Sequence, residues 1–163
     1  MNGNNFESKK EFDEFIKKIT LEDVVLVESN SKVISLSGRV EDNLESNIDL
    51  TEMDFETVIN MDNMKDFLIV CTLGCDFSIT KNTEQFLKIF TNVQAIYRVE
   101  NLDIDNYSLK EVAIGFAKES AYLHIISFLR VYIMDIVNKS GYPRYVLPLF
   151  KQIRDTQYEK YAE

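Results

Sequence analysis

Two cysteines and one histidine are the residues of this 163-residue chain whose types suit metal binding, redox chemistry or nucleophilic catalysis. Cys71 and Cys75 stand in the sequence CTLGC, inside a stretch whose apolar residues alternate with period two, so we expect them on one β-strand. Positions four apart on a strand lie about 13 Å from each other, beyond the ~7 Å that a disulfide bridges. We therefore expect two small core side chains, because free cysteine is among the most buried residue types. A metal or redox site is the alternative.

The single histidine, His124, has no cysteine, serine or carboxylate at the spacing that a catalytic or metal site requires. We expect a packing or interface role for it. The sequence contains no glycine-rich phosphate loop, no nucleophile elbow and no HExxH pattern. These observations predict a protein that is not an enzyme and that uses no cofactor or metal. An enzyme built on His124 is the alternative if that side chain faces a solvent-filled cleft beside a carboxylate.

Length and charge narrow the class of protein further. One domain is expected from 163 residues, and the formal charge of -9 argues against nucleic acid, which is bound through Lys and Arg. The polar N-terminus does not resemble a signal peptide. The most apolar run, from Ala121 to Val137, is interrupted by His124, Ser127, Arg130 and Asp135, so we expect no membrane span. A cytoplasmic protein is predicted.

The periodicity of the apolar residues predicts an α+β fold, in which a four-stranded antiparallel sheet is packed by a long C-terminal helix and a second short helix. The apolar positions of the second strand change parity between Leu50 and Met53, which indicates a bulge or a bend. The predicted elements are a short amphipathic helix at 7–19, strands near 24–36, 47–60, 67–79 and 87–99, a long helix at 108–140, a connector at 141–150 and a C-terminal helix at 150–161.

The long helix is expected to begin at a capping box of Ser108 and Glu111 and to end at Gly141 in the left-handed region. Its second half has apolar residues around most of its circumference, and such a helix must be covered on most sides. Since one sheet covers one side, we expect another subunit to cover the rest. The residues expected at this oligomer interface are Leu123, Ile126, Arg130 and Met134.

The connector after this helix has an unusual composition. Pro143 and Pro148 are the two prolines of the chain, and each pushes the preceding residue into an extended conformation. We expect a rigid span that displays apolar side chains, although it could also simply cover the end of the sheet. Phe86 and Phe90 lie on the second face of the last strand, either half-buried or part of an apolar surface. The residues expected in a binding groove are Tyr142, Pro143, Tyr145, Val146, Leu147, Pro148, Phe150, Phe86 and Phe90.

Three segments together resemble the SecB family of export chaperones, from about Thr20 onward. The sequence GYPRYVLPLF is similar to the family's connector, AYLHIISFLRVYIMDIVNKS to its long helix, and NVQAIYRVE to its last strand. The resemblance implies a homotetramer, built as a dimer of dimers, whose grooves hold non-native polypeptide without ATP. It also implies that Tyr142, Tyr145, Leu147 and Phe150 belong to the groove wall.

Some positions depart from the family pattern. Arg144 and Leu149 stand where the family has a second proline. Asp23 corresponds to one of the acids with which the family docks the translocase motor SecA, but Val27 falls where a second acid is expected. The leading hypothesis is therefore an ATP-independent holdase for unfolded or partly folded polypeptide. The alternative is a dedicated chaperone or binding module for one partner, such as an antitoxin, without a role in general export.

Overall fold

The computed structural model describes residues 9–36, 43–59, 65–102 and 107–142. The predicted C-terminal helix at 150–161 and the connector beyond Tyr142 lie outside the described residues. The elements in chain order are α1 (Lys9–Ile16), β1 (Ile19–Val33), β2 (Glu45–Leu50), β3 (Asp54–Ile59), β4 (Phe67–Lys81), β5 (Glu84–Val99) and α2 (Tyr107–Lys139).

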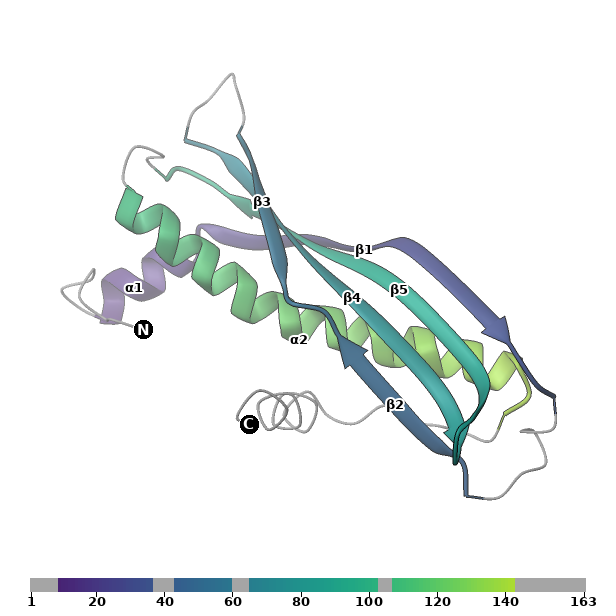
Figure 1. The fold of residues 1–163 in the computed structure, drawn as a ribbon. Coiled ribbons are helices and arrows are strands. Elements are labelled where there is room, and N and C mark those ends of the chain that lie inside the picture. Colours follow the sequence, from purple (N-terminus) through teal and green to yellow (C-terminus); the bar gives the residue numbers. More distant parts are fainter. Residues whose placement is uncertain (1–8, 37–42, 60–64, 103–106, 143–163) are drawn as a thin grey trace.

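All strand pairs are antiparallel, in the order β1-β5-β4, and both β2 and β3 then pair with β4. The helix α2 runs along one face of this twisted sheet (Figure 1). The predicted α+β class with a long helix on an antiparallel sheet is confirmed. The described residues form five strands where four were predicted, because the second predicted strand is divided into β2 and β3.

The division lies at residues 51–53, where the sequence changes parity. The N–H of Thr51 donates to the Gly74 carbonyl at 3.0 Å, and the N–H of Gly74 donates to Thr51 Oγ1 at 2.9 Å. A Cβ added at Gly74 would stand 2.8 Å from Thr51 Cγ2. Glycine at this position thus allows the broken edge strand to lie directly on β4, while Met53 turns into the core.

The central strands β4 and β5 follow their predicted alternation. The odd-numbered side chains from Phe67 to Ile79, and likewise those from Leu87 to Val99, are buried under α2. The turn between the strands contains Asn82 with φ of 55°, a left-handed conformation that asparagine tolerates. The register skips Phe86, so this bulged residue joins the core cluster although its parity would place it on the other face.

The edge strand β1 begins at Ile19, earlier than the predicted start at Val24. Its pairing with β5 skips Glu22 and Val27, and each of these bulges reverses the parity of the residues that follow. The side chains that pair opposite the core residues of β5 are therefore Ile19 and Leu21, then Val24 and Leu26, then Ser29, Ser31 and Val33. No single period-two pattern could reveal this strand.

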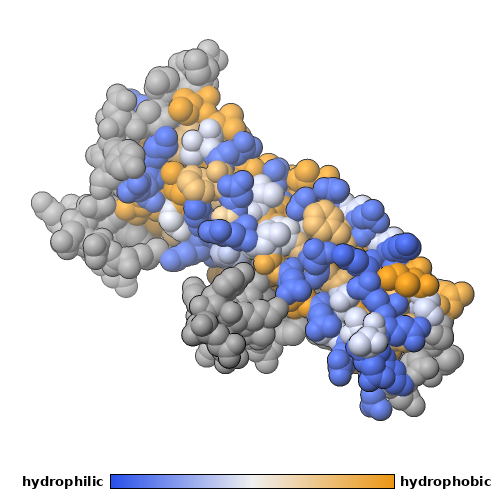
Figure 2. Space-filling model, in the orientation of Figure 1, coloured by the Kyte–Doolittle hydropathy of each residue, from blue (hydrophilic) through white to orange (hydrophobic). Residues whose placement is uncertain are grey.

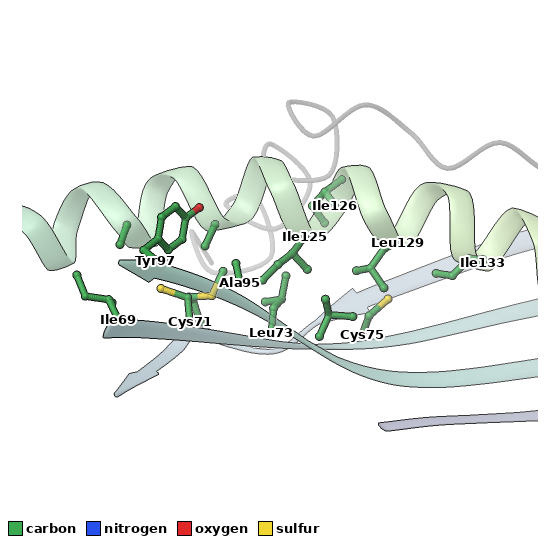
Figure 3. Close-up of a cluster of buried hydrophobic side chains, with 14 of the residues drawn as sticks. Ile69, Cys71, Leu73, Cys75, Ala95, Tyr97, Ile125, Ile126, Leu129 and Ile133 are labelled. Atoms are coloured by element: carbon green, nitrogen blue, oxygen red, sulfur yellow. The ribbon is translucent and has the colours of Figure 1, made fainter. Parts of the chain in front are cut away.

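Burial along α2 repeats every four residues. One row lies against the sheet and is fully buried (Figure 3); it consists of Ala113, Ala117, Ala121, Ile125, Leu129, Ile133 and Val137. Two flanking rows are mostly half-buried. Residues four apart form ridges inclined by about 26° to the helix axis, so the buried row winds around the helix as the sheet twists beneath it.

This winding is a second cause of the apolar circumference of α2, and the covering of α2 by another subunit stays a prediction. Apolar residues occur at all angles around the helix largely because the sheet-facing row itself winds around it. The row that faces solvent consists of Glu111, Gly115, Glu119, Leu123, Ser127, Val131, Asp135 and Lys139. The segment Lys110–Lys139 is long and apolar enough to cross a membrane by length and composition, criteria that a core helix also meets.

The contact at Gly74 leads to a first prediction. Gly74→Ala should lower the free energy of unfolding by about 1–3 kcal/mol, because the added methyl group overlaps Thr51. Urea denaturation measures the change. Combining Gly74→Ala with Thr51→Ser, which removes the nearest methyl group, should restore part of the loss. An unchanged denaturation midpoint for Gly74→Ala would contradict this account of the broken strand.

Candidate functional site

The end of α2 is fixed by Tyr142. Gly141 adopts φ of 80°, as predicted for a helix cap, and the N–H of Tyr142 bonds to the Val137 carbonyl at 3.3 Å. The Tyr142 hydroxyl lies 2.6 Å from the Ser35 carbonyl oxygen and 3.0 Å from that of Phe86. Its single hydrogen is shared between these two acceptors. We call this meeting point of Tyr142, Ser35 and Phe86 the Tyr142 junction.

The junction holds the end of β1 in place. The N–H groups of Ile34 and Ser35 also donate to the Phe86 carbonyl, at 2.7 and 3.3 Å. Ser35 is thereby tied at its N–H and its C=O, while the apolar residues around it point outward. We call Val33, Ile34 and Leu36 the exit patch; their exposed fractions are 38%, 45% and 62%. Figure 2 shows hydrophobic side chains at the end of the molecule where β1 ends.

The residues predicted to line a groove are distributed over three environments. Tyr142 and Phe86 are buried, at 4% and 2% exposure, and form the support of the junction. Phe90 is half-buried on the opposite face of the sheet, between Asn30 and Asp76 on the neighbouring strands. The bulge at Phe86 separates these two phenylalanines. The others, Pro143, Tyr145, Val146, Leu147, Pro148 and Phe150, lie outside the described residues.

The residues predicted at an oligomer interface are also divided. Leu123 and Met134 are exposed and Arg130 is half-buried, but Ile126 is 1% exposed and already packed within the protomer. Val131, 68% exposed, lies on the same solvent-facing row, about two turns beyond Leu123, and was not predicted at the interface. The exposed surface available to a second subunit on α2 is therefore narrower than predicted.

Asp23, the predicted docking residue for a partner, is exposed on the edge strand β1. One oxygen of its carboxylate accepts the N–H of Val24 at 2.8 Å. Asp54 makes the same contact with Phe55 on β3, also at 2.8 Å. In both edge strands an aspartate thus satisfies the backbone donor of the following residue.

The two cysteines are buried and the histidine is half-buried within the protomer. Cys71 and Cys75 are buried in the core, as predicted, and burial raises their pKa values to about 11 and about 12. The hydroxyl of Tyr97 lies 2.7 Å from His124 Nδ1, and burial raises the pKa of Tyr97 well above its usual range. Among the described residues no group of His, Cys, Asp and Glu side chains is arranged to hold a metal ion.

The sequence analysis missed the exit patch and the support of β3. The stretch VISL at residues 33–36 reads as the end of a strand, and only the tertiary bonds of Ser35 show that its apolar residues stay exposed. Lys118 lies with Nζ 3.6 Å from the centroid of the Phe55 ring, a cation–π contact that joins α2 to β3. Neither feature has a sequence signature.

Comparison with known proteins gives one informative similarity. No family model and no curated protein matches the sequence. The fold is similar to that of the Mycobacterium tuberculosis SecB-like chaperone Rv1957, solved in complex with a ChAD peptide from the Rv1956 HigA1 antitoxin. The TM-score is 0.62 at 11% identity, over 84% of this chain and 93% of that chain. A protein of unknown function from Streptococcus agalactiae matches with a TM-score of 0.40 at 15% identity, over 80% and 97%. The predicted SecB-like fold is confirmed.

The Tyr142 junction leads to a second prediction. Tyr142→Phe keeps the ring but removes the hydroxyl, and should lower the free energy of unfolding by about 1–3 kcal/mol because the Ser35 carbonyl loses the Tyr142 donor, while the Phe86 carbonyl retains the N–H groups of Ile34 and Ser35. Tyr132→Phe is the matched control, since its hydroxyl bonds to the exposed Ser29 hydroxyl at 2.7 Å and its loss should cost less than about 1 kcal/mol. Equal losses of stability for Tyr142→Phe and Tyr132→Phe in urea denaturation would show that the junction stabilises the fold no more than an exposed hydrogen bond does.

The buried thiols lead to a third prediction. Their native pKa values lie above the ordinary 9.0, so the unfolded chain loses its thiol protons first as the pH rises. The free energy of unfolding should therefore be insensitive to these thiols below about pH 9 and fall above it, by at most ~1.4 kcal/mol per pH unit and thiol. Urea denaturation between pH 8 and 10.5 measures the decline. The Cys71→Ala/Cys75→Ala variant should show a shallower decline of stability with pH. An identical slope for the variant and the wild type would contradict the assignment of this decline to the thiols.

Proposed function

We propose that this protein is an ATP-independent holdase chaperone that binds non-native polypeptide on exposed apolar surface. The observation that carries the proposal is the exit patch, three exposed apolar side chains within four residues whose backbone is held by the bonds of Ser35 to Tyr142 and Phe86. An apolar surface that its own fold prevents from collapsing is suited to an apolar partner. In this proposal the connector residues from Pro143 to Phe150, which lie outside the described residues, also bind the client.

The similarity in fold supports a polypeptide as the partner. The Mycobacterium tuberculosis neighbour is a SecB-like chaperone whose structure contains a peptide of an antitoxin. We infer that this chain also binds polypeptide in an extended or unfolded state. It does so in the cytoplasm, without a role for nucleic acid or membrane.

Modest affinity at each surface would be sufficient if several surfaces act together. Burial of one large apolar side chain contributes about 1.5–3 kcal/mol, and three such residues form the exit patch. A homotetramer, arranged as a dimer of dimers, would offer four copies along one client. In this assembly Leu123, Arg130, Val131 and Met134 are the exposed or half-exposed residues of α2 available for subunit contacts.

A second candidate function is a dedicated chaperone for one partner, such as an antitoxin. The antitoxin peptide in the neighbouring structure favours it. A dedicated chaperone would bind one segment tightly and ignore generic unfolded chains, whereas a holdase would bind many. Docking of SecA at Asp23 belongs only to the export role, and Val27 in place of a second acid favours the dedicated role.

The fourth prediction tests the exit patch. The wild-type protein should suppress aggregation of an unrelated unfolding protein at a near-stoichiometric ratio. Ile34→Asp/Leu36→Asp should weaken this suppression about tenfold or more, because two apolar contacts are replaced by charges that resist desolvation. Light scattering during thermal aggregation of the client measures the effect.

A matched control uses apolar residues of similar exposure within β1, away from the exit patch. Val25→Asp/Val27→Asp adds the same charge, and suppression should stay within about twofold of the wild type. Static light scattering checks the assembly of each variant against about 76 kDa, four times the 19.0 kDa chain. Suppression that is lost equally in both variants, or absent from the wild type at tenfold excess, would count against the holdase.

A further inference from the structure

Two lysines lie next to the exit patch, on the face of the sheet opposite α2. Lys32 on β1 pairs directly opposite Lys88 on β5, and both side chains are exposed. We call these two residues the lysine pair. Phe90 lies two positions from Lys88 and Ile34 two positions from Lys32, so the lysine pair stands between them on this face. Figure 2 shows hydrophilic side chains next to hydrophobic ones at this end of the molecule.

The positive charge of the lysine pair is only partly balanced by the fold. The Lys88 ammonium lies 3.4 Å from Asp76 Oδ1, an ion pair without a hydrogen bond, and both side chains are about half exposed to screening water. Within the described part of the chain no carboxylate forms an ion pair with Lys32. Glu28, four residues before Lys32 on β1, accepts a hydrogen bond from Asn92 Nδ2 at 3.1 Å instead. A countercharge for Lys32 is therefore missing.

Such a pair works against the stability of the sheet, because like charges directly opposite each other on neighbouring strands repel. It is also unexpected in a chain whose formal charge is -9 and which has many carboxylates to offer as partners. Arg98, a cation on the same face of β5, does have such a partner, since Glu22 on β1 accepts its Nε–H at 2.7 Å. A local conflict in an otherwise consistent fold is typical of a binding site.

We propose that the lysine pair binds an Asp or Glu side chain of the client polypeptide, while apolar residues on either side of that acid contact Ile34 and Phe90. The inference rests on the proposed polypeptide-binding function and names the sequence class that this surface selects. The carboxylate of the client supplies the missing countercharge, and charge-assisted hydrogen bonds to two ammonium groups hold it. The exposed Ile34 and the half-buried Phe90 receive the apolar neighbours.

The spacing of the strand positions sets the spacing in the client. Phe90 pairs opposite Asn30, so its position and that of Ile34 are four residues apart along β1, or about 13 Å at ~3.3 Å per residue. An extended client segment covers the same distance with five residues, of which the first, third and fifth point to one side. The preferred pattern is therefore an apolar residue, any residue, Asp or Glu, any residue and a second apolar residue.

The test uses the full-length protein and three fluorescent nine-residue peptides that differ only at the central position, which is Glu, Gln or Lys. Each peptide has Phe two residues before and Leu two residues after that position. Fluorescence anisotropy at low salt should show the Glu peptide binding at least fivefold more tightly than the Gln peptide, and about 0.5 M NaCl should remove most of this difference. The net charge of -9 repels an acidic peptide at long range, so a preference for Glu requires local positive charge. Equal binding of the Glu and Gln peptides, or tightest binding of the Lys peptide, would overturn the proposal.

Two matched variants separate the site from net charge. Lys32→Glu should weaken binding of the Glu peptide about tenfold and change binding of the Gln peptide less than twofold. Lys17→Glu makes the same change in charge at an exposed position just after α1, and should alter binding of either peptide less than twofold. Similar losses in both variants would reduce the effect to net charge and refute the site.

Urea denaturation distinguishes lost binding from a damaged fold. Lys32→Glu replaces two opposed positive charges by opposite charges, so the denaturation midpoint should stay equal or rise while binding of the Glu peptide falls. If Lys32→Glu lowers the midpoint, Lys32→Gln serves as the second variant, and it should at least halve the preference for Glu over Gln. An unchanged preference in Lys32→Gln would overturn the proposal.

Photo-cross-linking then locates the bound acid. A benzophenone side chain next to the central Glu of the peptide should react with residues 30–36 or 85–90, and cross-links confined to β2 and β3 would overturn the proposal. If the protein suppresses client aggregation but does not distinguish Glu from Gln, this inference fails, the lysine pair serves only to oppose pairing at the edge strand β1, and the holdase stands. If neither peptides nor unfolded proteins bind, the proposed function itself fails.

Discussion

The packing of every fourth residue of α2 against a twisted sheet is the constraint on which the rest of the structure depends. Alanines at 113, 117 and 121 let the first half of the helix approach the sheet closely, and Ile, Leu and Val fill the wider space under the second half. Because the buried row follows an inclined ridge, it stays on the sheet from Ala113 to Val137. A helix of this length spans the domain and delivers its C-terminus to the end of the sheet.

The position of the C-terminal end of α2 determines which apolar side chains remain exposed. The helix ends at Gly141, and Tyr142 reaches back to the carbonyl groups of Ser35 and Phe86. These carbonyl groups are hydrogen-bonded within the protein, so a rearrangement of the backbone at the end of β1 would break these bonds. The neighbouring side chains of Ile34 and Leu36 are left exposed as a consequence. Rigid display of this kind reduces the entropy lost when a flexible chain binds.

The sequence was sufficient to predict those elements along which one hydrophobic pattern continues without interruption. β4 and β5 alternate strictly because one face of each is core along its whole length, and Gly141 identified the end of α2. β1 was misplaced because two bulges interrupt its alternation, and Phe86 was assigned to the wrong face for the same reason. The apolar circumference of α2 was attributed to a covering subunit, whereas the winding of the buried row along the sheet is a cause within the protomer that periodicity does not reveal. The exit patch depends on hydrogen bonds between residues about 50 to 110 positions apart, which no local pattern records.

Both edges of the sheet have features that oppose pairing with another strand, but these features differ between the two edges. β1 is fifteen residues long and apolar in part, and its bulges at Glu22 and Val27 break the regular row of backbone groups that another strand would need. β2 and β3 are short, and they are separated by the contact of Thr51 with Gly74 and bordered by carboxylates. Bulges disturb the regular geometry that an incoming strand needs, whereas the carboxylates oppose pairing between copies of this chain through charge repulsion. The two edges therefore oppose edge-to-edge association by geometry on one side of the sheet and by charge on the other.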